Sequence, residues 1–124
     1  MMDRQELIGR WDLVSFERTK DGRVTGAPLG PKPSGFLLYG ADGTMAAFLH
    51  RDPDLKREGP ALAAYGGPWE LKGGEVHHYV LFNTDADRAG KPLVRLARFD
   101  DGRLILETPP KDGGGLRITW TRHR

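Results

Sequence analysis

Two adjacent histidines, His77 and His78, are the residues in this chain whose types most directly suggest chemistry. Neighbouring residues of a β-strand point to opposite faces, so the pair cannot easily chelate one metal ion. The chain has no cysteine that could complete such a site, and we expect neither a metal nor a cofactor. An imidazole titrates near neutral pH, which makes a partly buried His78 a candidate general acid or base. The alternative is a core histidine hydrogen-bonded to a neighbouring strand or to water.

Glu17 and Arg95 are the charged residues that could assist His78. Glu17 would move a proton, and Arg95 would hold a carboxylate or an enolate by charge-assisted hydrogen bonds. The alternative is an internal ion pair between the two side chains. Ser15 has no nucleophile-elbow pattern around it, so serine-hydrolase chemistry is not expected, and we place it among the ligand contacts.

Several aromatic residues could stack on a bound ring, although the interior of a barrel needs aromatic filling in any case. These candidate ligand contacts are Tyr39, Trp69, Phe82, Phe99 and Trp120.

The elements that would position these side chains are short strands. The 17 glycines and 9 prolines fall between apolar runs, which is typical of many strands joined by turns. We predict a helical turn over 3–8 with Asp3 as its cap, a connection over 26–35, and a short helical segment near 53–65. Predicted strands cover residues 10–19, 35–40, 44–50, 68–72, 75–83, 93–100, 103–108 and 116–123. Sequential antiparallel strands with so little helix predict an all-β fold, a closed up-and-down barrel of about eight strands in one domain, 1–124.

Two-residue turns fix which side chains share a face. Pairing around Asp101-Gly102 carries Arg95 to the same apolar face as Phe99, and pairing around Gly73-Gly74 sets Trp69 opposite His78. That second face continues to Phe82, so all these side chains are predicted to point inward.

In the first strand, the period of two groups Trp11, Leu13, Ser15 and Glu17 on one face. In the hairpin 35–50, both faces are apolar. One holds Phe36, Leu38, Met45, Ala47 and Leu49, the other holds Leu37, Tyr39, Ala46, Phe48 and His50, and which of them points inward is left open. Polar groups inside the barrel must pair with each other or border a wet cavity, as a ligand site does.

Composition excludes several classes of protein. Hydrophobic residues make up 38% and charged residues 29% of the 124, as in a globular domain. No apolar run approaches the roughly 20 residues of a membrane span, and no signal peptide is visible, so we expect a cytoplasmic protein that does not bind membranes. The 19 basic and 17 acidic residues are interspersed, which argues against nucleic-acid binding.

The sequence resembles the bacterial lipocalin-like domain proteins, which are calycin-type barrels. The resemblance is carried by the segments 7–16 (LIGRWDLVSF), 35–45 (GFLLYGADGTM), 76–78 (VHH), 98–110 and 118–122 (ITWTR). It implies that Trp11 plugs the narrow end of the barrel and that Arg122 packs across its indole. The segment after the histidine pair lacks the tryptophan usual in the family, and the insert over 51–66 is short. Since the family has no single activity, the resemblance implies a fold far more than a function.

Three hypotheses for function follow. The leading one is a barrel that binds a small, largely apolar molecule with a polar or anionic end. The second is a cofactor-independent cyclase or isomerase, as the resemblance to barrels of biosynthetic pathways implies, with His78, Glu17 and Arg95 at work in the interior. The third is a solidly packed barrel that forms a homodimer through Val14, Phe16, Leu37 and Phe48 on its outer face.

Overall fold

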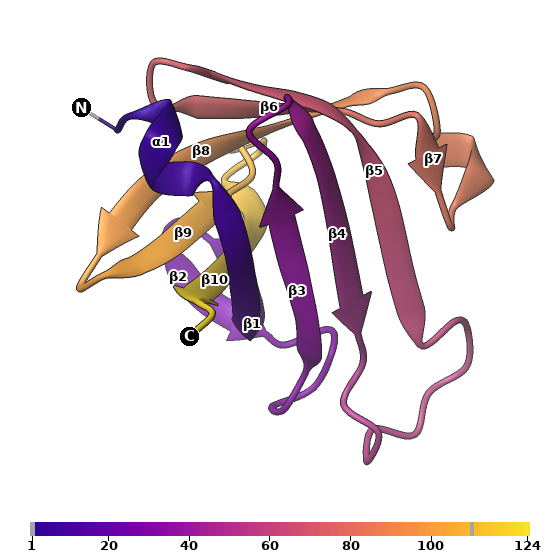
Figure 1. Ribbon diagram of the computed structural model, residues 1–124. Helices are drawn as coiled ribbons and strands as arrows, with labels where there is room; N and C mark the ends of the chain where they lie inside the picture. The colour runs from indigo at the N-terminus through magenta and orange to yellow at the C-terminus, as the bar shows by residue number, and fades with distance from the viewer. Residues whose placement is uncertain (1, 110) are drawn as a thin grey trace.

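The computed structural model describes residues 2–109 and 111–124, which form a strongly curved antiparallel sheet (Figure 1). One helical turn, α1 (Arg4–Leu7), precedes the strands, and a short 3-10 helix, η1 (Ala86–Arg88), follows β7. The strands are β1 (Gly9–Lys20), β2 (Arg23–Gly26), β3 (Ser34–Tyr39), β4 (Thr44–His50), β5 (Leu62–Lys72), β6 (Glu75–Tyr79), β7 (Phe82–Asn83), β8 (Pro92–Asp100), β9 (Arg103–Glu107) and β10 (Gly114–Arg122).

The sheet closes into a barrel because its first and last strands pair. Neighbouring strands follow the order β10-β9-β8-β6-β5-β4-β3-β1, and β1 pairs along its length with β10. Two short strands stand outside this ring: β2 pairs with the end of β1, and β7 pairs with β5. The prediction of an all-β, closed antiparallel barrel of eight strands with a short N-terminal helical turn is confirmed.

One end of the barrel is closed by α1, which lies across it in Figure 1. Asp3 caps this turn, and the indole nitrogen of Trp11 donates a hydrogen bond of 2.9 Å to the carbonyl of Leu7. The Arg122 guanidinium lies 4.2 Å from the centre of the Trp11 ring and donates to the carbonyl of Ile8 at 3.0 Å. These contacts hold the end of β10 against the start of β1.

The prediction of a short helical segment near 53–65 is wrong. Residues 51–61 form a loop with a turn at Pro53, and β5 begins at Leu62. The buried Asp52 carboxylate explains why this loop is ordered without a helix, since it accepts hydrogen bonds from the backbone amides of Lys32 and Asp54. It thus joins this loop to the connection over 27–33.

The prediction that Ser15 and Glu17 face the interior is also wrong. A β-bulge at Val14 inserts one residue into β1, so that Leu13 pairs with Trp120 whereas Ser15 pairs with Thr119. An extra residue reverses the alternation of faces beyond it. Phe16, which pairs with the buried Ile118, therefore points inward.

The β3–β4 hairpin departs from the predicted grouping of faces for a related reason. Tyr39 pairs with Met45, and the backbone amide of Gly40 donates to the carbonyl of Thr44, so the turn consists of the three residues 41–43 rather than of the two that Asp42-Gly43 suggests. This odd number of residues shifts the partners by one position. The residues that face the core combine members of both predicted sets: Leu37, Tyr39, Met45, Ala47 and Leu49.

Within the described residues, neither helix is long and apolar enough to cross a lipid bilayer.

Candidate functional site

A cavity of about 460 Å³ opens inside the barrel on the side away from Trp11. Strands β1, β4, β5, β8 and β10 contribute its walls, and its rim is formed by the β7–η1 segment and the loops around Leu29 and Pro60. Its lining is mostly aliphatic and comprises Phe16, Leu29, Leu49, Pro60, Leu62, Ala63, Tyr65, Asn83, Thr84, Asp85, Arg88, Leu93, Arg95, Leu116 and Ile118. A volume of this size lies within the range of small-molecule sites.

Arg95 brings a positive charge into this apolar wall. It lies in β8 opposite Val76, and the only hydrogen bond of its guanidinium among the described residues is to the neighbouring carbonyl of Val94, at 3.0 Å. No carboxylate of the described chain forms an ion pair with it. Burial lowers the pKa of Arg95, but a guanidinium ordinarily titrates so far above neutrality that the side chain remains charged.

Behind the cavity wall, three side chains form a hydrogen-bonded chain. The Tyr39 hydroxyl lies 2.6 Å from Nε2 of His78, and the Tyr65 hydroxyl lies 3.4 Å from Nδ1 of the same ring. His78 and Tyr39 are almost fully buried, whereas Tyr65 lines the cavity. Burial raises the pKa of both tyrosines, so both hydroxyls keep their protons at neutral pH.

His78 is held in its neutral form. Burial lowers the pKa of this imidazole to about 3, and the nearby charge of Arg95 acts in the same direction. At neutral pH the ring therefore offers one donor and one acceptor. Because Tyr65 stands between the ring and the cavity, His78 reaches a bound molecule only through that hydroxyl.

None of the five predicted aromatic ligand contacts lines the cavity. Tyr39, Trp69 and Trp120 are buried in the core, and the Trp69 indole donates to the carbonyl of Gly40 at 3.0 Å near the closed end. The Trp120 indole nitrogen is buried without a hydrogen-bond partner among the described residues. Phe99 packs against Trp11 with their ring centres 6.1 Å apart.

The expectation that Phe82 points into the barrel is wrong. β6 ends at Tyr79, and the chain turns to form β7, where Phe82 pairs with Gly66 and is 74% exposed. Gly67 permits this turn, because its φ is +157° and a Cβ there would lie 2.0 Å from the carbonyl oxygen of Tyr79. Asn83, the next residue, lines the cavity instead.

The structure separates the three predicted catalytic residues. Arg95 lines the cavity, and His78 lies behind its wall. Glu17 pairs with Arg117, whose guanidinium binds Glu107 at 3.4 Å on the outside of the barrel. Ser15 shares that outer face. His77 also points outward, 3.4 Å from a Glu75 oxygen, so the two histidines lie on opposite sides of the sheet.

Tyr65 is the functional candidate that sequence reasoning missed. It lies in the Ala-rich stretch that was predicted as helix, so no strand register was assigned to it. Only the register of β5 with β4 places it inside, since Tyr65 pairs with Ala47, an inward-facing residue. Phe16 was missed because nothing in the sequence marks the bulge at Val14.

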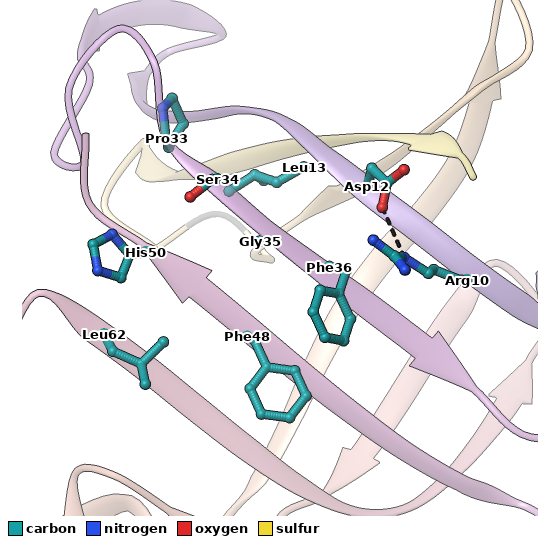
Figure 2. Close-up of a pocket in the computed structure, with 10 residues that line it drawn as sticks. All are labelled: Arg10, Asp12, Leu13, Pro33, Ser34, Gly35, Phe36, Phe48, His50 and Leu62. Atoms are coloured by element: carbon teal, nitrogen blue, oxygen red, sulfur yellow. Dashed lines mark hydrogen bonds and ion pairs between the residues drawn. The ribbon is translucent and has the colours of Figure 1, made fainter. Parts of the chain in front are cut away.

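A second hollow, of about 590 Å³, lies on the outer face of β1, β3 and β4 (Figure 2). The Phe36 and Phe48 rings lie side by side in it, with their centres 4.9 Å apart. The Arg10 guanidinium lies 4.7 Å from the centre of the Phe36 ring and bonds to Asp12 at 3.0 Å. Its charged group is therefore already paired, unlike Arg95.

Two of the four residues that the dimer hypothesis placed outside point inward. Phe16 lines the cavity and Leu37 is buried in the core, whereas Phe48 lies in the outer hollow.

The described residues contain no group of three or more side chains that could together hold a metal ion.

The lipocalin-like domain family matches residues 8–122 of this chain. No curated protein matches it. Among solved structures, a redesigned β-barrel superposes on it with a TM-score of 0.52, covering 97% of this chain and 94% of that chain at 13% sequence identity, and this similarity shows the fold alone. Since the family match runs from before the first strand of the barrel to the end of the last, the chain belongs to the lipocalin-like domain family.

Proposed function

We propose that the protein binds a small, largely apolar molecule with a polar or anionic end inside the barrel. The observation that carries this proposal is the Arg95 guanidinium in the aliphatic wall of the cavity, which has no ion-pair partner among residues 2–109 and 111–124. A charge partly removed from water without a partner is unfavourable, and a ligand with an anionic end would compensate it. The body of such a ligand would cover the apolar lining, which includes Leu49, Leu93 and Ile118.

The geometry supports binding better than proton-transfer catalysis. Glu17 lies outside the barrel, and a neutral His78 with a pKa of about 3 is a weak base at neutral pH. Of the groups proposed for an isomerase or cyclase, only Arg95 lines the cavity.

The test is a screen by native mass spectrometry and thermal shift against lipophilic acids and polyketide-like compounds. A ligand present at a hundred times its dissociation constant stabilises the folded state by about 2.7 kcal/mol, which is readily measured as a rise in melting temperature. Ala63→Trp would fill the cavity from β5 and is expected to abolish this rise.

The matched control is Ala64→Trp, since Ala64 pairs with the outward-facing Phe48 on the other side of the same strand. A ligand that binds the Ala63→Trp protein as tightly as the unmodified one would place binding elsewhere and contradict the proposal.

A further inference from the structure

The direction of the hydrogen bonds around His78 can be deduced from the number of protons available. The neutral imidazole carries a proton on either Nδ1 or Nε2. Among the described residues, the buried Tyr39 hydroxyl has no partner other than Nε2 of this ring. If Nε2 carried the proton, the Tyr39 proton would be buried with no acceptor, an arrangement that costs the desolvation of that group.

The opposite arrangement satisfies the Tyr39 hydroxyl and both ring nitrogens of His78. Tyr39 donates to Nε2, and Nδ1 then carries the proton and donates to the Tyr65 oxygen at 3.4 Å. The proton of Tyr65 is left free. Since Tyr65 lines the cavity, it presents this proton to whatever lies there.

The cavity therefore offers two kinds of donor, and the one carboxylate in its lining, Asp85, is already paired with Arg88 at the rim. Arg95 and Tyr65 both line it, and the charge of Arg95 is close enough to affect the pKa of Tyr65. The rim guanidinium of Arg88 already has a partner, since it lies 3.3 Å from an Asp85 oxygen. One unpaired cation and one hydroxyl match a singly charged head group, and the parallel N–H bonds of a guanidinium match the two oxygens of a carboxylate.

We propose that Arg95 and the Tyr65 hydroxyl together bind the carboxylate of an apolar acid, and that His78 and Tyr39 are positioning residues that direct the Tyr65 proton into the cavity. This inference rests on the proposed function and names the head group of its ligand. It requires that His78 be protonated on Nδ1 and that the site prefer an acid to the alcohol of the same length.

The first arm of the test needs no ligand. In protein labelled with ¹⁵N-histidine, the resonances of His78 are identified as those lost in His78→Gln. We expect Nε2 to show the shift of an unprotonated ring nitrogen and Nδ1 that of a protonated one. Protonation on Nε2 would overturn the proposed direction of the chain. In Tyr39→Phe, which removes the donor to Nε2, we expect the Nε2-protonated form to increase.

The second arm compares octanoate with octanol, octyl sulfonate and octyl phosphate by calorimetry. Octanoate is expected to bind roughly 10- to 100-fold more tightly than octanol, the size of effect that charge-assisted hydrogen bonds give. Equal binding of acid and alcohol would overturn the carboxylate clamp and leave the proposed cavity function standing, whereas tighter binding of the sulfonate or phosphate would overturn the head group alone. If neither octanoate nor octanol binds and the wider screen also finds no ligand, the proposed function itself fails.

Variants separate the clamp from a general effect of charge. Arg95→Gln is expected to remove most of the preference for octanoate over octanol, and Tyr65→Phe to reduce it roughly 10-fold. Arg98→Gln is the matched control, because Arg98 lies on the same strand with the same charge but binds Glu107 on the outer face. Tyr39 does not line the cavity, yet Tyr39→Phe is expected to weaken octanoate binding and to leave octanol binding unchanged. An octanoate affinity that is unchanged in Tyr39→Phe would refute the positioning role.

Discussion

Acid should destabilise this protein in a way that depends on one buried side chain, His78. Its pKa is about 3 in the folded state and 6.5 in the unfolded chain, because burial disfavours the charged ring. Between these values the unfolded chain binds a proton that the folded barrel does not, so stability falls as the pH falls. Each pH unit in this window contributes about 1.4 kcal/mol, or about 5 kcal/mol across the whole window.

The assay is urea unfolding followed by tryptophan fluorescence, from roughly pH 7 to roughly pH 4, in which His78 should account for a loss of roughly 3 kcal/mol. Carboxylates such as Asp12, whose pKa is lowered by its hydrogen bond to His123, lose stabilising interactions over an overlapping range. The contribution of His78 is therefore the difference between the slopes of the unmodified protein and His78→Gln.

The control for this experiment is Tyr39→Phe, which removes the 2.6 Å hydrogen bond to the ring but keeps the titrating group. We expect it to lower stability at all pH values and to retain the dependence on pH. If His78→Gln loses stability on acidification as steeply as the unmodified protein, the burial of a neutral imidazole is not the cause and the reasoning is refuted.

Three further perturbations test how the barrel is held closed. Arg122→Ala removes the guanidinium from the Trp11 indole and from two backbone carbonyls, which should lower the free energy of unfolding in urea by about 2–3 kcal/mol. Arg122→Lys cannot stack as a planar group on the indole, so it should not restore this stability. Gly67→Ala should lower the free energy of unfolding by more than about 3 kcal/mol, because its Cβ would lie 2.0 Å from a backbone oxygen. A Cβ at Gly74 meets open space, so Gly74→Ala should lower it by less than about 1 kcal/mol. Similar losses at the two glycines would contradict this account. Asp52→Ala removes the acceptor of the Lys32 amide and should speed proteolysis of the loop over 51–61, and an unchanged cleavage rate would show that the carboxylate does not hold this loop.

The sequence predicts a face correctly where a turn has the length that its residues suggest. Around Gly73-Gly74 and Asp101-Gly102, the two-residue turns set Trp69 opposite His78 and Phe99 opposite Leu104, as the register shows. Arg95 was placed inside the barrel by the same reasoning, because alternation continues without interruption along β8.

Prediction of faces from the sequence fails where one additional or missing residue changes the strand register. The bulge at Val14 moves Glu17 to the outside, and the three-residue turn over 41–43 regroups the β3–β4 faces. Neither has a strong local signal, since Val14 is an ordinary strand residue and Asp42-Gly43 is typical of a shorter turn. Register errors of this kind propagate, because every residue beyond the extra one changes face.

His78 and Arg95 show what strand alternation leaves undetermined. Alternation predicts that both point inward, and by that measure the two residues are alike. Their partners differ: His78 has two tyrosine hydroxyls and remains neutral, whereas the charged Arg95 side chain has, within the part of the chain that the structure describes, only a neighbouring carbonyl. The imidazole is thus satisfied by the protein itself, whereas no carboxylate of residues 2–109 and 111–124 forms an ion pair with the guanidinium, which is why we propose an anionic ligand for it. Since the partners of His78 come from two other strands, β3 and β5, only the closed barrel distinguishes a polar group that the protein satisfies from one that it leaves without a partner among the described residues.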